Sequence, residues 1–231
     1  MRYALTVALL ALTLAACSEG TDPEGTIILE ADFNEASGWT PDFVDVATAQ
    51  ETEVEFVGKV QALPPNLPAD RFGLYHAGTN VSDDLFMYFK KQVVGVVPDQ
   101  VYDATFEVTF ASNAGAGCDI GPSSIWVKAG ASQQQPARRV DSDGMLRLSV
   151  DKGQQQNDGA SALNLGDIRN TTSGCPQDAP FGARFVTSGS RSVEVQATPD
   201  GSLWVFLGSE SGFEVRHELY FLTLRVVLRP R

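Results

Sequence analysis

The chain has few of the residues on which enzyme and nucleotide sites depend. It contains two histidines, His76 and His217, and three cysteines among 231 residues. Neither histidine is accompanied by a serine or cysteine nucleophile motif, so no catalytic triad can be assembled from the sequence. A phosphate-binding loop and a dinucleotide fingerprint are also missing from it. These absences argue against nucleophilic and nucleotide-dependent enzymes.

Positive charge is also scarce. The chain has 17 Lys and Arg residues against 29 Asp and Glu residues, which gives a formal net charge of −12. Non-specific binding to nucleic acid requires a basic surface. We therefore expect no nucleic-acid partner, and a well-solvated acidic surface instead.

No apolar run is long enough to cross a bilayer, which needs roughly 20 residues. The longest run covers residues 4–16 and follows a single positive charge at Arg2. A short apolar run after a basic residue, ending in small residues, is typical of a secretory signal. We therefore expect residues 1–16 to be a signal peptide.

The last residues of this run, LAAC at 14–17, resemble the lipobox of bacterial lipoproteins. The resemblance implies cleavage before Cys17 and attachment of palmitate-type acyl chains to it; the alternative is an ordinary signal with a chance cysteine at its cleavage site. Two or three acyl chains hold a protein on a membrane. The polar, acidic stretch 17–25 then reads as a flexible tether. Ser18, in place of an aspartate, implies the outer membrane if the source is Gram-negative.

The other two cysteines, Cys118 and Cys175, lie in Gly- and Pro-rich stretches. An exported protein meets an oxidising compartment, so a disulfide between them is the default expectation. Such a bridge contributes roughly 4 kcal/mol in the chain-entropy model. Two free thiols are the alternative. Neither histidine lies at the sequence separation from these cysteines that is typical of metal ligands, which disfavours a metal site.

Residues 26–231 show short β-rich runs bounded by Gly, Pro, Asn and Asp, without sustained helical periodicity. This pattern predicts one all-β domain, a two-sheet antiparallel β-sandwich of the jelly-roll type. The expected strands are 26–31, 43–46, 52–57, 73–76, 85–94, 101–112, 123–129, 145–151, 184–187, 192–197, 202–208 and 214–228. Two long stretches, 130–144 and 152–180, are expected to be loops that are either functional or disordered.

Three segments resemble carbohydrate-binding modules with the galactose-binding-like jelly roll. They are ADFNEASGW at 31–39, VVGVVPDQVY at 93–102 and LYFLTLRV at 219–226. The resemblance implies the fold and a glycan ligand. Leu222 and Thr223 replace the acidic pair that often helps to hold a structural calcium ion in that family, so the resemblance does not supply this site.

Two oxygen-rich turns are the remaining calcium candidates. NVSDDL at 80–85 contains Asp83 and Asp84, and DSDG at 141–144 contains Asp141 and Asp143. Calcium binds six to eight oxygen ligands. Asp and Asn also favour turns because their side chains bond the local backbone. We therefore expect no cofactor other than a structural calcium ion at one of these turns.

Tryptophans are the usual sugar-stacking residues, and the chain has three. Trp126 and Trp204 are flanked by apolar residues, which predicts core positions. Trp39 stands beside glycine and near proline and is the best candidate for an exposed ring. Ligand binding is therefore expected near Trp39, Asp83, Asp84 and the 152–180 loop, because loops on a rigid sandwich commonly carry recognition.

One pattern suggests catalysis. Glu51, Glu53 and Glu55 alternate with other residues and would share a face of a strand, with neighbours about 6–7 Å apart. Retaining glycosidases hold two carboxyls about 5–5.5 Å apart. A polar outer face explains the same alternation.

The prediction is a lipid-anchored protein of the cell envelope whose sandwich is a non-catalytic binding module, with glycan as the leading ligand. A structural lipoprotein that contacts another envelope protein is the alternative, and a sandwich-type glycoside hydrolase is the third.

Overall fold

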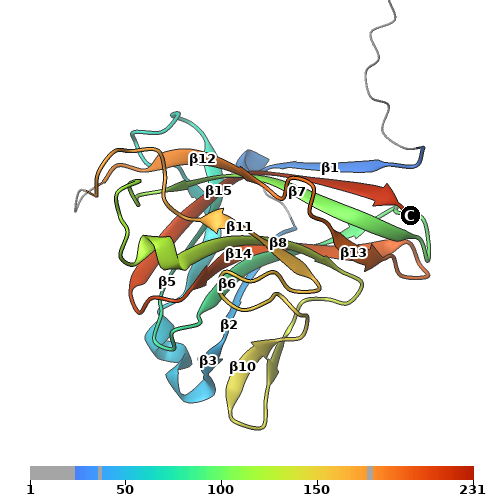
Figure 1. Ribbon diagram of the computed structural model, residues 1–231, viewed down its shortest axis with the longest axis horizontal. Coiled ribbons are helices and arrows are strands. Elements are labelled where there is room, and N and C mark those ends of the chain that lie inside the picture. Colours follow the sequence, from blue (N-terminus) through green and yellow to red (C-terminus); the bar gives the residue numbers. More distant parts are fainter. Residues whose placement is uncertain (1–23, 36–37, 176–178) are drawn as a thin grey trace, which may run out of the picture.

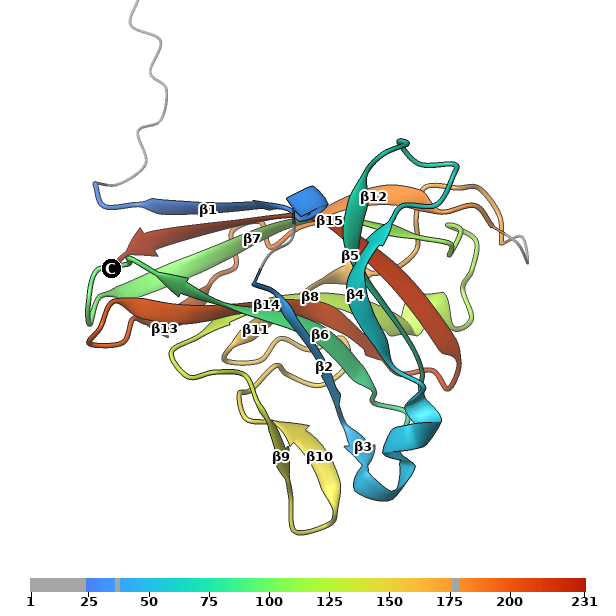
Figure 2. The same ribbon diagram turned by 180° about the vertical axis from the view of Figure 1, so that it is seen from behind.

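The computed structural model describes residues 24–231 except 36–37 and 176–178. Its strands form two antiparallel sheets that pack face to face, with a small third sheet at one end (Figures 1 and 2). The all-β jelly-roll sandwich predicted from the sequence is thereby confirmed. The predicted signal peptide, Cys17 and most of the tether lie outside the described residues. Within the described part of the chain, no helix is long and apolar enough to cross a membrane.

The larger sheet, sheet A, has seven strands, and the opposing sheet B has five. Sheet A runs in the order β12 (Gly182–Thr187), β7 (Val101–Ser112), β15 (Arg216–Pro230), β5 (Phe72–Thr79), β4 (Val57–Ala62), with β1 (Ile27–Asp32) beside β15 and β13 (Val193–Gln196) beside β7. Sheet B runs β11 (Ala162–Asp167), β8 (Ile125–Ser132), β14 (Ser202–Ser211), β6 (Phe86–Val94), β2 (Thr40–Val44). The small sheet contains β3 (Val46–Ala47), β10 (Met145–Leu148) and β9 (Arg138–Val140).

The alternation along β7 builds the core between the sheets. Tyr102, Phe106 and Phe110 are buried and belong to one cluster with Val127 and Leu203 of sheet B. Ala104 and Val108 between them are also buried in this cluster, whereas the odd-numbered residues from Asp103 to Thr109 are partly exposed on the opposite face. Burial of one such aromatic side chain contributes about 1.5–3 kcal/mol. The period-2 pattern of apolar residues therefore fixes which face of β7 lies inward.

The outer face of sheet B is not fully open to solvent. Phe86, Tyr88 and Phe206 lie on it and pack with Leu148 and the partly buried Val150. The β9–β10 hairpin and the segment that follows it therefore cover part of this face. Figure 2 shows this hairpin projecting from the sandwich beside β3.

The predicted strand 52–57 is wrong. Residues Thr48–Val54 form a 3₁₀ helix, η2, and Glu55 follows it in the left-handed region with φ 48°. Of the helix residues only Val54 is buried, so the segment lacks the alternate buried side chains of a strand. Glu51 forms an ion pair with Arg138. The carboxylate spacing that suggested a hydrolase does not exist in the fold.

Three strands were missed: β4, β9 and β11. The last of these, Ala162–Asp167, lies inside the predicted 152–180 loop. Its pairing with β8 is interrupted by an irregularity between Asn164 and Gly166, and Gly166 has φ 129°. The bulge breaks the alternation that would have marked the strand in the sequence.

The predicted Cys118–Cys175 disulfide is present. It joins the connection between β7 and β8 to the connection between β11 and β12. Backbone hydrogen bonds support the same contact: the amide of Ala116 donates to the carbonyl of Thr172 at 2.7 Å, and that of Gly117 donates to Gly174 at 2.9 Å. The connection between β11 and β12 is therefore held against the connection between β7 and β8.

Candidate ligand-binding pocket

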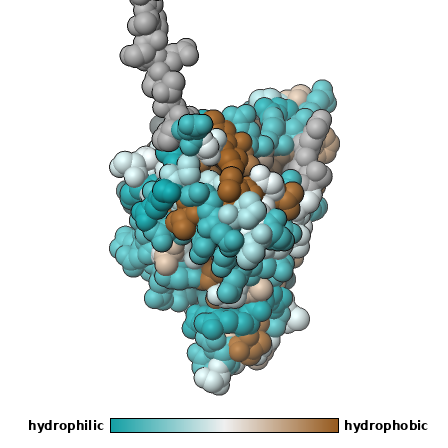
Figure 3. Space-filling view, turned by 90° about the vertical axis from the view of Figure 1, so that its right-hand side faces the viewer, coloured by the Kyte–Doolittle hydropathy of each residue, from teal (hydrophilic) through white to brown (hydrophobic). Residues whose placement is uncertain are grey.

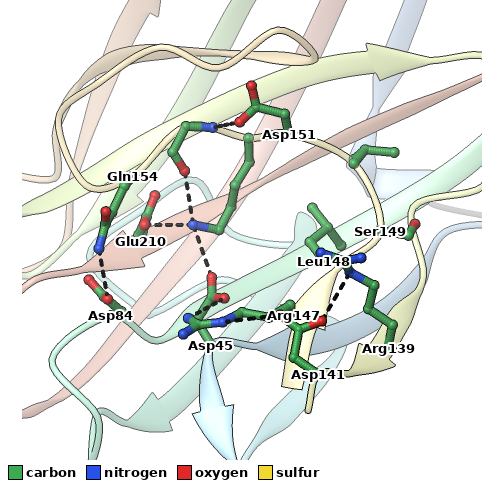
Figure 4. A pocket seen from close by; sticks show the side chains of 13 residues that line it. Asp45, Asp84, Arg139, Asp141, Arg147, Leu148, Ser149, Asp151, Gln154 and Glu210 are labelled. Carbon is green, nitrogen blue, oxygen red and sulfur yellow. Dashed lines mark hydrogen bonds and ion pairs between the residues drawn. The ribbon is translucent and has the colours of Figure 1, made fainter. Parts of the chain in front are cut away.

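An open pocket of about 560 Å³ lies where the β9–β10 hairpin and the following segment meet the outer face of sheet B (Figure 4). We call it the sheet-B pocket. Most of its lining side chains are polar or charged. They are Asp45, Asp84, Arg139, Asp141, Arg147, Leu148, Ser149, Val150, Asp151, Lys152, Gly153, Gln154 and Glu210.

Lys152 lies at the floor of the pocket, between two carboxylates from different parts of the chain. Its Nζ atom is 2.6 Å from Oε1 of Glu210 on β14 and 2.9 Å from Oδ2 of Asp45, which follows β2. It also donates to the carbonyl of Gly153 at 3.2 Å. Burial acts to lower the pKa of Lys152, but Asp45 and Glu210 outweigh burial and raise it. Lys152 is therefore an ammonium at neutral pH.

Lys128 on β8 lies beneath the same segment with a fully buried side chain. Its Nζ atom is 2.7 Å from Oε2 of Glu210 and donates to the carbonyls of Lys152 and Asn157 at 2.9 and 3.0 Å. Burial lowers the pKa of Lys128, and Glu210 opposes that shift. The lysine thereby fixes the segment after β10 to sheet B.

Each of these two ammonium groups has three protein partners, which equals its number of N–H donors. Glu210 and Asp45 in turn are held by Lys152. The floor is therefore a preorganised charge cluster without a free lysine donor, and ligand contacts fall to the groups around it.

One wall of the pocket belongs to the hairpin. Arg139 on β9 and Arg147 on β10 flank Asp141 in the turn region, with N···O distances of 3.6 and 4.0 Å. Arg147 also lies 3.3 Å from Oδ1 of Asp45. Arg139 is the more exposed of the two, at 61% of its side chain. Its guanidinium group therefore retains N–H donors for a ligand.

The opposite wall joins Asp84 to the segment after β10. The carboxylate of Asp84 accepts hydrogen bonds from Nε2 of Gln154 and Nε2 of Gln155, both at 3.1 Å. Asp151 accepts from the backbone amides of Ala160 and Gly153, and these bonds lower its pKa. Both carboxylates have lone pairs left for hydroxyl groups.

The structure brings together some of the predicted site residues. Asp84 and Asp141 line the same pocket, and Asp84 contacts the predicted 152–180 loop. Asp83 is exposed beside the pocket without lining it, and Asp143 accepts a hydrogen bond from the amide of Met145. Among the described residues, no group of three or more His, Cys, Asp or Glu side chains is arranged to hold a metal ion. Calcium binding stays a prediction.

Trp39 lies elsewhere, partly buried against the main core. Its ring packs edge-on against Phe33 with centroids 5.3 Å apart. The predicted core positions of Trp126 and Trp204 are wrong. Both rings are half-buried on the outer face of sheet B, because their neighbours Val127 and Val205 point into the core. None of the described residues that line the sheet-B pocket is aromatic.

The charge cluster was missed in the sequence because its members are far apart along the chain. Asp45, Lys128, Lys152 and Glu210 come from four segments. One signal was visible: Lys128 and Glu210 interrupt otherwise apolar or small-residue runs. A charged residue in such a run indicates a partner on the same face of a sheet.

A second polar group lies in the core and resembles part of a nucleophilic site. Ser209 Oγ is 3.0 Å from Nε2 of His76 and 2.9 Å from Nε2 of His217. Ser209 is completely buried, and neither histidine has a carboxylate partner among its described hydrogen bonds. Burial lowers the pKa of both histidines. A substrate cannot reach this serine, so the group is structural.

Fold and pocket together define a β-sandwich with a polar binding pocket on the outer face of one sheet. No protein-family model matches the chain, and no curated protein matches it either. Solved structures with a similar arrangement include the CBM22-1 xylan-binding domain of Xyn10C from Paenibacillus barcinonensis, at 14% identity and a TM-score of 0.38, covering 88% of this chain and 94% of that one.

Two others are the K1 cleaved adhesin domain of Lys-gingipain from Porphyromonas gingivalis W83 and a cyclase from Fischerella sp. TAU. The first has 9% identity and a TM-score of 0.40, with 87% of this chain and 97% of that one covered. The second has 13% identity and a TM-score of 0.41, with 88% and 98% covered.

Proposed function

We propose that the protein is a lipid-anchored, non-catalytic binding module of the cell envelope, and that its ligand is a neutral, hydroxyl-rich glycan held in the sheet-B pocket. The observation that supports this most is the presence of both hydrogen-bond acceptors and donors around the pocket. Carboxylates of Asp84 and Asp151 lie on one side, and the guanidinium groups of Arg139 and Arg147 flank Asp141 on the other.

Sugar hydroxyls both donate and accept hydrogen bonds, so they suit a wall that offers both acceptors and donors. Hydrogen bonds to charged groups contribute about 1.5–3 kcal/mol each. The lining has five acidic and three basic side chains, an excess of two negative charges, which disfavours an anionic ligand. Without an aromatic platform in the pocket, we expect weak affinity, micromolar or poorer.

A hydrolase would need one carboxyl free to protonate a leaving group. Asp45 and Glu210 face each other across Lys152, and both are engaged by its ammonium group. Asp141 lies between two arginines. The carboxylates of this pocket are therefore suited to orient hydroxyls rather than to exchange protons. Incubation with the bound polysaccharide should release no reducing ends.

The direct test is a glycan array followed by calorimetric titration of the best neutral oligosaccharide, with and without calcium. Asp84→Asn removes a charged acceptor and should weaken binding about tenfold or more. Asp99→Asn is the control, because Asp99 is an exposed aspartate in the turn after β6 and does not line the pocket.

Equal affinity of the Asp84 and Asp99 variants would place the ligand elsewhere. Failure to bind any glycan, together with co-purification of a defined envelope protein, would favour the structural alternative. An affinity that depends on calcium would indicate that the ion binds near Asp84 and Asp141 together with the glycan.

A further inference from the structure

A second cavity, of about 420 Å³, opens between the two sheets on the side where β1 faces β6. We call it the β1–β6 groove. Its lining is mainly apolar, with one cation, Lys91, and one anion, Glu30, at its rim. The other lining residues are Ile28, Leu29, Ala31, Trp39, Gln92, Val93, Val94, Val205, Leu224 and Val226.

Apolar side chains at the groove are unusually exposed. Val94 is 74% exposed and Ile28 is 44% exposed. β14 pairs with one edge of β6 as far as Val94, but β2 pairs with the other edge only as far as Lys90, so beyond that point no described strand of sheet B covers this second edge. Exposed apolar side chains that form a contiguous patch mark interaction sites. Figure 3 shows apolar side chains gathered on this end of the molecule.

The groove lies next to the point where the N-terminal segment joins the fold. Its wall strand, β1, begins at Ile27, ten residues after Cys17. An extended chain of ten residues spans at most about 35 Å. After cleavage of residues 1–16, the acyl chains expected on Cys17 would hold this end of the chain at a membrane. The tether therefore confines this end of the sandwich to the neighbourhood of the bilayer.

We propose that the β1–β6 groove is a membrane-docking surface, which rests on the proposed anchoring at Cys17. Val94 and Ile28 enter the lipid headgroup region, and Trp39 follows at the mouth of the groove. Tryptophan is favoured at the water–lipid interface, where its ring is partly buried. With Lys91 and Glu30 the groove has little net charge, so the partner is a zwitterionic lipid surface. The overall negative charge disfavours an anionic one.

The experiment couples the protein to vesicles through Cys17. Every described strand lies after residue 26, so a chain that starts at Cys17 retains the whole fold. Cys118 and Cys175 are bonded to each other, which leaves Cys17 as the thiol that reacts with a maleimide lipid in phosphatidylcholine vesicles. Phosphatidylcholine brominated near the headgroup then quenches tryptophans that reach the bilayer. We expect quenching in the wild type, and Trp39→Phe should remove the quenched component.

Val94→Asp should reduce this quenching several-fold. Val140→Asp is the matched control, because Val140 is an exposed valine, 62% accessible, on the β9–β10 hairpin. Both sites are exposed, so neither change should unfold the protein, and circular dichroism verifies this. No quenching, or equal loss in the two variants, would overturn the docking proposal. A concentration-dependent dimer that Val94→Asp abolishes would assign the groove to a second copy instead.

Failure of this proposal is distinguishable from failure of the anchor. Acyl labelling at Cys17 in cells reports on the anchor alone, whereas chemical coupling tests docking whether or not the cell acylates the protein.

Discussion

Ser209 on β14 and His76 on β5 join the two sheets through a hydrogen bond of 3.0 Å inside the core. His217 on β15 lies on the other side of the same hydroxyl at 2.9 Å. A hydroxyl has one proton, so one imidazole accepts it and the other donates to the oxygen. The accepting ring must be neutral, and burial disfavours the charged form of both rings, which makes the interface between the sheets sensitive to acid.

The first prediction concerns this acid sensitivity. Burial lowers the pKa of His217 to about 4, and burial together with His217 lowers that of His76. Below pH 6.5 the unfolded chain takes up protons that the folded protein does not bind. Stability is therefore complete above about pH 6.5 and is lost as the pH falls toward 4. Between pH 7 and pH 5 the contribution of His217 to the free energy of unfolding should fall by about 2 kcal/mol, with a further loss from His76, as measured by urea denaturation.

His217→Gln supplies the control, because glutamine keeps a polar group but does not titrate. The pH dependence between 7 and 5 should be about halved in this variant. Asp151 and Asp167 have lowered pKa values, so their effect on stability falls below the pH range 7 to 5 and does not obscure the titration of the histidines. A flat profile in the wild type would contradict the prediction.

The second prediction concerns the charge cluster under the pocket. Lys152→Met leaves Asp45 and Glu210 buried without their shared ammonium group. Loss of one partner from a buried ion pair costs about 3–5 kcal/mol. Arg71→Met removes the exposed pair with Asp32, whose side chains are 40% and 60% accessible, and should cost less than about 1 kcal/mol. Chemical denaturation of both variants measures the difference, and equal losses would refute it.

The third prediction concerns the disulfide. Cys175→Ser should lower the free energy of unfolding by about 2–4 kcal/mol, because the unfolded chain loses a constraint. Non-reducing peptide mapping should recover Cys118 and Cys175 in one linked peptide. Quantitative labelling of both thiols in the native, unreduced protein would exclude the bond.

The fourth prediction concerns the anchor. Cys17→Ala should abolish acyl labelling and leave an unprocessed or mislocalised precursor, because the thiol is the expected site of acylation. Radiolabelled fatty acid incorporation and membrane fractionation measure the two effects. A variant that is still cleaved and fractionates like the wild type would remove the lipid anchor from the proposal.

The sequence predicted those strands that bury alternate apolar residues. β7 was predicted with its observed bounds because apolar residues repeat with period 2 and face the core, namely Tyr102, Ala104, Phe106, Val108 and Phe110. The same alternation of residue types at Glu51, Glu53 and Glu55 led to the prediction of a strand that does not form. There the alternating residues are charged, and nothing in their spacing distinguishes a solvated strand from the 3₁₀ helix that forms.

The candidate site was predicted only in part. Asp84 was found because it lies in an oxygen-rich turn, and the long loop that meets it was identified by its length. The buried pairing of Lys128 and Lys152 with Glu210 depends on strand order in sheet B, which places β8 beside β14. Strand order is set by long-range packing and leaves no local trace in the chain.

Val94 pairs with Ser202 at one end of sheet B, and Phe86 pairs with Glu210 at the other. Eight residues of extended strand span about 26 Å, so the pocket end stands well clear of the groove end. A polymer can therefore cross the pocket of an anchored molecule without being pressed against the headgroups. If the proposed anchor and glycan ligand hold, neighbouring copies on one membrane bind the same polymer at several points, and this multivalency strengthens weak single-site binding without any change in the pocket.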